Sequence, residues 1–180
     1  SLNIQPDQAM VHSFRGTAKL AQGKVREAAQ DYQKVVQLDP NNPVAKADLG
    51  FALFFLEDYA GASQQFEAAL AANKALKHLH PWNLVAVKRS QPQVNIAQKF
   101  TPLLETDIQK WDWADQVLAY QLDKLTEEQL LASTQGENAQ VSQAQQCEAH
   151  FFIGQKMALA GNSQQAVAHF RKAVETKVSH

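Results

Sequence analysis

One pair of residues has the types and the spacing that nucleophilic catalysis would need. Cys147 precedes His150 by three residues, and side chains three residues apart lie on the same face of a helix. An imidazole beside a thiol can accept its proton and leave a thiolate, which is the reactive form of cysteine. Cysteine-dependent catalysis is therefore one hypothesis that the sequence raises.

A second candidate is the pair of histidines in the segment KHLHPW, which could suggest a metal site. His78 and His80 are two residues apart, so on a helix they point in different directions, and no further ligand stands nearby at zinc-like spacing. We interpret the segment as a solvent-facing linker. The chain also lacks a Gly-rich phosphate loop, a Gly-x-Ser-x-Gly elbow and a His-Glu-x-x-His pair. The sequence thus predicts no enzyme, no metal site and no cofactor.

Two tryptophans form a third candidate, because tryptophan is enriched at binding hot spots. Trp111 and Trp113 flank Asp112. Residues two apart on a helix face different ways, so we expect one of the two rings to be buried. We interpret both rings as mainly structural.

Composition limits the class of protein. The 180 residues suffice for one compact domain or a short stack of helical repeats. Lysines and arginines number 17 against 18 aspartates and glutamates, a formal charge of -1, so no net field would attract nucleic acid. The longest apolar run, around Phe51 to Leu56, is far shorter than the ~20 residues that span a bilayer. The single cysteine forms no internal disulfide and leaves the compartment open.

The strongest pattern is an internal repeat of 34 residues, carried by small and aromatic residues: Gly16 with Gly50, Ala28 with Ala62, and Tyr32 with Phe66. Small residues let two antiparallel helices approach closely, and the rings are expected to fill the space between one hairpin and the next. Gly23 is predicted to form the turn between the helices with a positive φ. Glu57 takes its place in the second copy, where we expect a slightly different turn.

A third copy near the C-terminus has the same internal spacing, in Gly154, Gly161, Ala166, Phe170 and Ala173. The period and the residue types resemble the tetratricopeptide repeat (TPR). The resemblance implies an all-α fold, a TPR-type α-solenoid of stacked antiparallel helical hairpins with two regular repeats, an irregular middle and one further C-terminal repeat. No segment alternates as a strand would.

We predict a single TPR-like domain over residues 1–180. Its expected parts are the tail of a preceding repeat at 1–7, repeat 1 at 8–42, repeat 2 at 43–75, degenerate hairpins at 76–139 and the C-terminal repeat at 140–180. Caps, breakers and apolar spacing predict helices at 8–22, 25–38, 43–56, 59–72, 81–90, 93–101, 108–122, 126–133, 142–160 and 163–177. The tail at the start leads us to expect that the native protein extends upstream of Ser1.

The repeat gives the histidines a structural place. His150 occupies position 4 of the last repeat and His12 occupies position 4 of the first, where TPRs take a large residue that packs within the hairpin. We therefore prefer a structural interpretation of His150 to a catalytic one.

Three segments carry a narrower resemblance, to the NlpI-like bacterial TPR lipoproteins: WDWADQVLAYQLDKLTEEQLL at 111–131, CEAHFFIGQKMALAGN at 147–162 and AVAHFRKAVETKV at 166–178. The sequence departs from that family at Asp123, where glycine is common, and at His180, which precedes the usual closing helix. We therefore expect the last hairpin to expose an apolar face or to pair with another copy.

The NlpI-like resemblance implies an adaptor, often dimeric, on the periplasmic side of the outer membrane, which presents proteases or cell-wall hydrolases with partners. Related modules also occur in cytosolic chains, so the compartment stays open. An alternative is an oligomerisation or structural module of a larger chain whose activity lies in another domain.

The TPR resemblance also implies a concave groove along the first helices of successive hairpins. The residues that we assign to it are Ser13, Phe14, Thr17, Asp48, Phe51 and Phe55. The groove is mainly apolar and aromatic and lacks the lysines and asparagines that clamp chaperone carboxylates, so it suits a protein partner that offers a helix or an extended peptide. The alternative is self-burial, in which Phe54 and Phe55 pack on the following hairpin.

Overall fold

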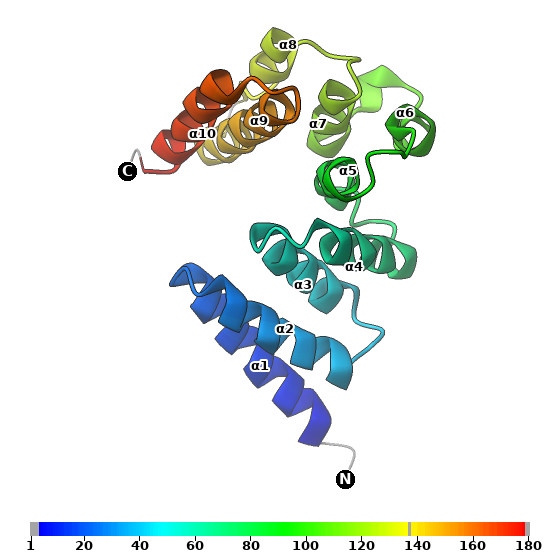
Figure 1. Ribbon diagram of the computed structural model, residues 1–180, viewed down its shortest axis with the longest axis vertical. Coiled ribbons are helices and arrows are strands. Elements are labelled where there is room, and N and C mark those ends of the chain that lie inside the picture. Colours follow the sequence, from blue (N-terminus) through cyan, green and yellow to red (C-terminus); the bar gives the residue numbers. More distant parts are fainter. Residues whose placement is uncertain (1–3, 137, 179–180) are drawn as a thin grey trace. The chain divides into compact units, whose positions relative to one another are not determined.

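The protein is all-helical in the parts that the structure describes, residues 4–136 and 138–178 of a computed structural model (Figure 1). The helices in chain order are α1 (Ile4–Ala21), α2 (Val25–Leu38), α3 (Pro43–Phe55), α4 (Tyr59–Ala72), α5 (Leu79–Ser90), α6 (Ile96–Phe100), α7 (Trp113–Gln121), α8 (Glu127–Ala132), α9 (Ala139–Leu159) and α10 (Ser163–Val178). Two 3-10 turns, η1 (Thr101–Leu103) and η2 (Ile108–Lys110), lie between α6 and α7. Within these ranges no residue lies in a strand, which confirms the predicted fold class.

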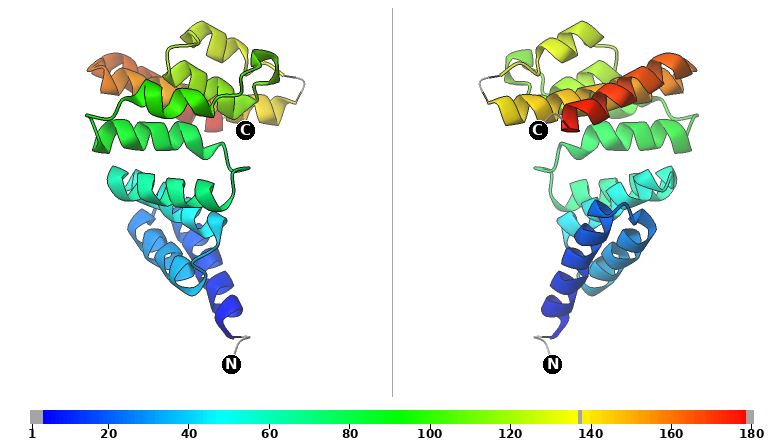
Figure 2. Two further views of the ribbon diagram at one scale, coloured as in Figure 1. Left: turned by 90° about the vertical axis from the view of Figure 1, so that its right-hand side faces the viewer. Right: turned by 90° about the vertical axis from the view of Figure 1, so that its left-hand side faces the viewer.

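The chain divides into two compact units, with the boundary between Gln93 and Val94. The boundary falls inside the stretch predicted to hold degenerate hairpins. In the first unit α1 pairs with α2, α3 pairs with α4, and α5 lies along α4 (Figure 2). In the second unit α9 and α10 form the longest hairpin, and α7 and α8 contact α9. None of the helices in the described ranges has the length and apolar character to cross a membrane.

Several helices begin where a side chain accepts hydrogen bonds from backbone N–H groups of the first turn: Asn42 for α3, Asp58 for α4, Asn95 for α6, Asp112 for α7, Thr126 for α8 and Asn138 for α9. These caps satisfy donors that the helix leaves unpaired. They also explain two differences from prediction. The helix expected from 108 begins at Trp113 because Asp112 and Asp115 form a capping box, and α9 begins at Ala139 because Asn138 caps it.

Two further starts differ from prediction. Helix α1 begins at Ile4, so residues 4–7, expected to be the tail of a preceding repeat, belong to this helix. Helix α5 begins at Leu79, which is fully buried. The interpretation as a solvent-facing linker fits His78, which lies in an exposed turn, and is wrong for His80, which lies in the first turn of α5.

Four hairpins turn through a left-handed residue that lies two positions after the last residue of the first helix: Gly23 at φ 74°, Glu57 at φ 63°, Asp123 at φ 61° and Gly161 at φ 82°. In each turn the next backbone N–H reaches five residues back, as from Lys24 to the carbonyl of Lys19 at 2.9 Å and from Asn162 to that of Met157 at 2.9 Å. This bond is the mark of a Schellman cap. Glu57 thus turns as Gly23 does, and Asp123 gives the irregular middle a turn of the same kind.

In three hairpins an aromatic ring lies on a glycine of the facing helix. A Cβ added to Gly16 would come within 2.9 Å of Tyr32, one on Gly50 within 2.7 Å of Phe66, and one on Gly154 within 2.6 Å of Phe170. The rings were expected to lie between hairpins, but their glycine contact is within their own hairpin. Tyr32 serves both purposes, because it also joins a buried cluster with Leu49 and Ala52 of α3.

The turn geometry predicts that two substitutions change stability in opposite directions. Glu57→Gly should raise the free energy of unfolding by about 1 kcal/mol, because a left-handed conformation is strained for a residue with a Cβ and not for glycine. Gly23→Ala should lower it by about the same amount. Urea unfolding followed by circular dichroism measures both. Midpoints that move in the same direction would show that backbone strain is not what distinguishes these turns.

Candidate functional site

A hollow of about 500 Å³ opens in the first unit between α1, the end of α2 and the start of α3. Helix α1 contributes Ala9, Met10 and Ser13; α2 and the corner after it contribute Val35, Leu38, Asp39 and Asn42; α3 contributes Val44, Ala45 and Asp48. The hollow shares α1 and α3, the first helices of successive hairpins, with the predicted groove.

The corner between α2 and α3 fixes the shape of the hollow. The Asn42 side chain accepts hydrogen bonds from the N–H groups of Val44 and Ala45 at 3.0 and 3.1 Å, and the Asn42 N–H donates to the carbonyl of Asp39 at 3.2 Å. Pro43 at the first helical position suits this start, since it lacks the N–H that would be unpaired there. The cap sets the register of α3, and Val44 and Asp48, four residues apart, share one face.

The rim of the hollow exposes apolar side chains. Met10 on α1 and Val44 on α3 line it and are each more than half exposed, and Phe14, one turn beyond Met10 on α1, is 68% exposed. Single exposed apolar residues are common on protein surfaces. Three of them beside a concave surface are more typical of a binding site.

Asp48 is the one half-buried acid of the hollow. Burial raises the pKa of its carboxyl group, because a charged group loses solvation when neighbouring atoms displace water. Within the described ranges, no side chain is hydrogen-bonded to Asp48 or forms an ion pair with it. The hollow therefore presents an unpaired carboxylate beside apolar surface.

The six residues assigned to the groove do not stay together. Ser13 and Asp48 line the hollow. Thr17 is held to its own hairpin, since its hydroxyl donates to the Ser13 carbonyl at 3.1 Å and lies 3.2 Å from the Tyr32 hydroxyl. Phe14 stands exposed on α1. The groove assignment remains a prediction for these four residues.

The other two assigned residues, Phe51 and Phe55, belong to an aromatic cluster on α3, α4 and α5. Phe51 meets both Phe66 and Trp82 edge-on at centroid distances of 5.2 Å. The ring centroid of Phe55 lies 6.1 Å from that of Trp82, and the ring centroid of the buried Phe54 lies 5.2 Å from that of Trp82. The self-burial alternative thus describes Phe54 well and accounts for much of Phe51, while about half of Phe55 remains exposed.

Sequence reasoning missed the part of the hollow that comes from α2 and the corner. Val35, Leu38, Asp39 and Asn42 lie outside the first helices to which the groove was assigned. The available signal was the segment QLDPNN, in which a proline and two asparagines mark a turn and a helix cap. Trp82 was missed in the same way, because it lies outside the regular repeats.

Comparison with known proteins identifies the repeat. Residues 19–86, which contain α2 to α4 in full, match the family described as tetratricopeptide repeat. This stretch of the chain carries the tetratricopeptide repeat. The similarity confirms the resemblance read from the 34-residue period.

Two relatives are similar in sequence to this TPR protein. A lipoprotein NlpI homolog of Haemophilus influenzae is 24% identical over 183 residues, which cover 99% of this chain and 57% of the relative. The heat-shock protein cognate co-chaperone sgt12 of Aspergillus fumigatus is 33% identical over 72 residues, which cover 40% of this chain and 21% of the relative. The chain thus spans little more than half the length of the first relative.

The fold is also similar to a solved structure. The crystal structure of MamA aligns with a TM-score of 0.50 and 17% sequence identity, covering 96% of this chain and 80% of that chain. The likeness supports the TPR-type arrangement of hairpins.

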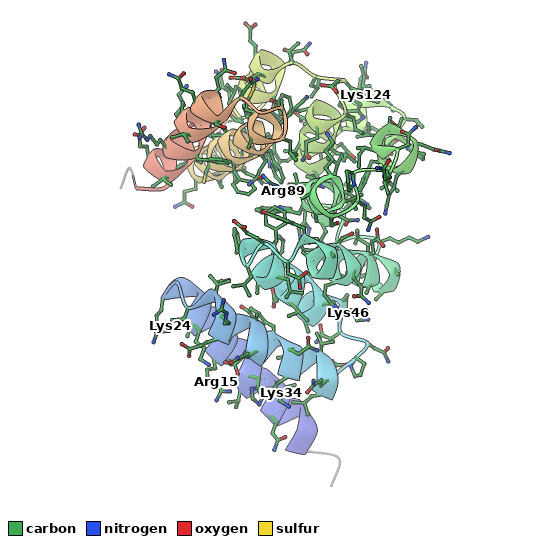
Figure 3. All side chains as sticks on the ribbon, in the orientation of Figure 1. Arg15, Lys24, Lys34, Lys46, Arg89 and Lys124 are labelled. Carbon is green, nitrogen blue, oxygen red and sulfur yellow. The ribbon has the colours of Figure 1, made fainter. Side chains whose placement is uncertain are left out.

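The first TPR buries a carboxylate inside its hairpin. Asp31 on α2 accepts hydrogen bonds from Arg15 of α1, which Figure 3 labels, and lies 3.0 Å from both His12 Nδ1 and Lys19 Nζ. These contacts hold the pKa of Asp31 well below its usual range, and the hydrogen bond from Arg15 has the largest effect. His12 thus packs within the hairpin, as predicted, and does so through a charged partner.

The last TPR places a second histidine where the first has Asp31. His169 follows Asp31 by 138 residues, as His150 follows His12. The two rings approach with their Nδ1 atoms 3.2 Å apart, and His169 Nε2 is 3.5 Å from Glu127 Oε1. The pKa of His150 is lowered. The largest cause is burial, followed by the nearby His169 and Lys172. His150 thus packs against α10, which favours the structural interpretation.

The remaining candidates also hold the second unit together. Trp111 Nε1 donates to the Glu105 carbonyl at 2.8 Å, and Trp113 Nε1 donates to Glu148 Oε2 at 2.7 Å. Both tryptophans are half-buried, so the expectation that one ring is fully buried is wrong. Across the described ranges no three His, Cys, Asp or Glu side chains gather in a manner that could hold a metal ion.

The His150–His169 contact predicts a loss of stability on acidification. The pKa of His150 is lowered from 6.5 in the fold, so the unfolded chain binds this proton first, and stability falls as the pH drops through 6.5 toward the lower folded value. Urea midpoints measured from about pH 8 to about pH 5 should decrease over this window. His150→Phe should flatten the decrease, and His78→Gln, at an exposed position, should not. Equal slopes in all three proteins would contradict the assignment.

Proposed function

We propose that this chain is a non-catalytic scaffold that binds a peptide or helix of a partner protein in the hollow of its first unit. The observation that carries the proposal is the hollow itself, formed by the first helices of two successive TPRs and rimmed by exposed apolar side chains. A partner that covered Met10 and Val44 would remove apolar surface from water, which stabilises a complex by about 25 cal/mol per Å² of apolar area.

The proposed surface differs from the groove first assigned. It keeps Ser13 and Asp48, extends along α1 to Phe14, and gains the α2–α3 corner. Phe51 lies outside it, because its ring is committed to Phe66 and Trp82. A substitution of Phe51 would disturb the packing of α3 on α4 and α5, so it would not report on binding alone.

A finer proposal concerns the class of partner. The similarity to a lipoprotein NlpI homolog extends over 99% of this chain. In the NlpI-like family, to which the sequence shows a resemblance, the partners are proteases or cell-wall hydrolases at the periplasmic side of the outer membrane. Affinity purification followed by mass spectrometry tests this proposal, and a set of captured proteins without either enzyme class would contradict it.

The hollow predicts the effect of one substitution and supplies a matched control. Val44→Ser should weaken partner capture about threefold to tenfold, because it removes apolar contact worth on the order of 1 kcal/mol. Val141→Ser should leave capture unchanged. Both valines lie in the first turn of a helix capped by asparagine and are 55% and 50% exposed, so their effects on the fold should match.

Capture from a lysate of the source cells, with quantitative mass spectrometry of wild type and both variants, measures this difference. Phe14→Ser, added to the same comparison, shows how far the surface extends along α1. Equal capture by Val44→Ser and Val141→Ser, with unchanged circular dichroism, would remove the hollow from the interface.

A second candidate function is self-association, favoured by the last hairpin. Val167 and Val174, seven residues apart on α10, are both exposed, and residues seven apart share one helical face. These two exposed valines support the proposal that the last hairpin offers apolar surface to a second copy. A second copy of the chain is the occupant that this function would require.

Sedimentation velocity distinguishes this second candidate from the first. A dimer at micromolar concentration that Val174→Glu converts to monomer would support self-association through α10, because burying an unpaired charge is costly. Wild-type protein that sediments as a monomer over the same range would exclude it.

A further inference from the structure

The basic side chains of α1 all lie toward its own hairpin. His12, Arg15 and Lys19 surround the buried Asp31 of α2. The described residues of α1 that line the hollow are Ala9, Met10 and Ser13. The fold therefore separates the cations of this helix from its binding surface.

The charge that remains in the hollow is negative. Asp48 and Asp39 line it, and none of the described residues in its lining is a lysine, an arginine or a histidine. The nearest basic residues of the same helices, Lys34 on α2 and Lys46 on α3, are labelled in Figure 3 and are absent from the lining. Lys34 donates to Gln37 on its own helix at 3.1 Å. No described side chain neutralises Asp48.

A half-buried carboxylate of this kind discriminates between partners by charge. An ammonium or guanidinium group placed beside it would form a charge-assisted hydrogen bond in a partly desolvated site. An acidic side chain or a C-terminal carboxylate placed there would be repelled, which costs affinity and gives specificity. The apolar rim at Met10 and Val44 lies within the same hollow and offers contact to an apolar neighbour of that cation.

We propose that the hollow accepts a lysine or arginine side chain of the partner segment at Asp48, next to an apolar side chain that covers Met10 and Val44. The proposal rests on the scaffold function proposed above and specifies the chemistry of its ligand. It is the opposite of a carboxylate clamp, in which basic residues of the groove bind an acidic end of the partner.

A peptide selection tests the proposal without knowledge of the natural partner. The probe is a random twelve-residue library displayed on phage and selected in parallel on the whole chain and on its Asp48→Asn variant. We expect peptides selected on the wild type to be enriched in lysine or arginine beside leucine, isoleucine or phenylalanine. Selection on Asp48→Asn, which keeps the shape of the side chain, should lose the basic residue and keep the apolar one.

A charge-reversal cycle on one selected peptide gives the quantitative test. Asp48→Asn should weaken binding of the basic peptide about tenfold, as expected for the loss of a charge-assisted contact, and Asp48→Lys should weaken it further. Replacing the basic residue of the peptide by glutamate should restore binding to Asp48→Lys and not to the wild type. Fluorescence anisotropy of the labelled peptide measures each dissociation constant, and thermal unfolding shows that each variant is folded.

The outcomes separate this inference from the scaffold function. Peptides that bind through Val44 but carry no basic residue, or that bind Asp48→Asn as well as the wild type, would overturn the inference and leave the scaffold function standing. A selection that yields no peptide sensitive to Val44→Ser would overturn both. Enrichment of acidic peptides would show that the hollow recognises the opposite charge.

Discussion

An aromatic ring on a glycine sets the distance between the helices of three hairpins. Any Cβ at Gly50 would meet the Phe66 ring at 2.7 Å, which is closer than atoms in a packed interior approach, so a larger residue there would force the helices apart. The left-handed turn at Glu57 closes the same hairpin seven residues further on. The tight turn holds the two helices close together. If they were further apart, Phe66 would lose its contact with Gly50.

The proposed binding surface lies where this packing leaves space unfilled. The C-terminal half of α3 is covered, because Phe51 and Phe54 meet Trp82 of α5. The N-terminal half of α3, with Val44 and Asp48, lines the same hollow as Met10 and Ser13 of α1 and the end of α2. One helix therefore serves as core at one end and as surface at the other, and the Asn42 cap determines where the surface begins.

The repeat pattern predicted the hairpins closely and the site only in part. The 34-residue spacing of Gly16 and Gly50 identified the facing helices, because the distance between backbones depends on residue size at that position. The spacing did not predict which residues from other helices contact the outward-facing side chains of a hairpin. Thr17 and Phe51 hold equivalent places on successive helices, yet Thr17 contacts Tyr32 of its own hairpin and Phe51 meets Trp82, which lies outside the regular repeats. The start of α7 at Trp113 depends on its capping side chain, Asp112. The spacing of apolar residues does not predict such a start.

Asp31 has a structural role in the fold, whereas Asp48 has a recognition role only in the proposed function. Asp31 lies inside the first hairpin, where Arg15, His12 and Lys19 compensate its burial. Asp48 lies one hairpin further along, half-buried and without a cation among the described residues. A buried charge that the fold compensates stabilises one conformation and adds nothing to binding. In the proposed function a cation of the partner would complete the interaction that Asp48 leaves open, so the position of Asp48 carries the proposal about the ligand's charge.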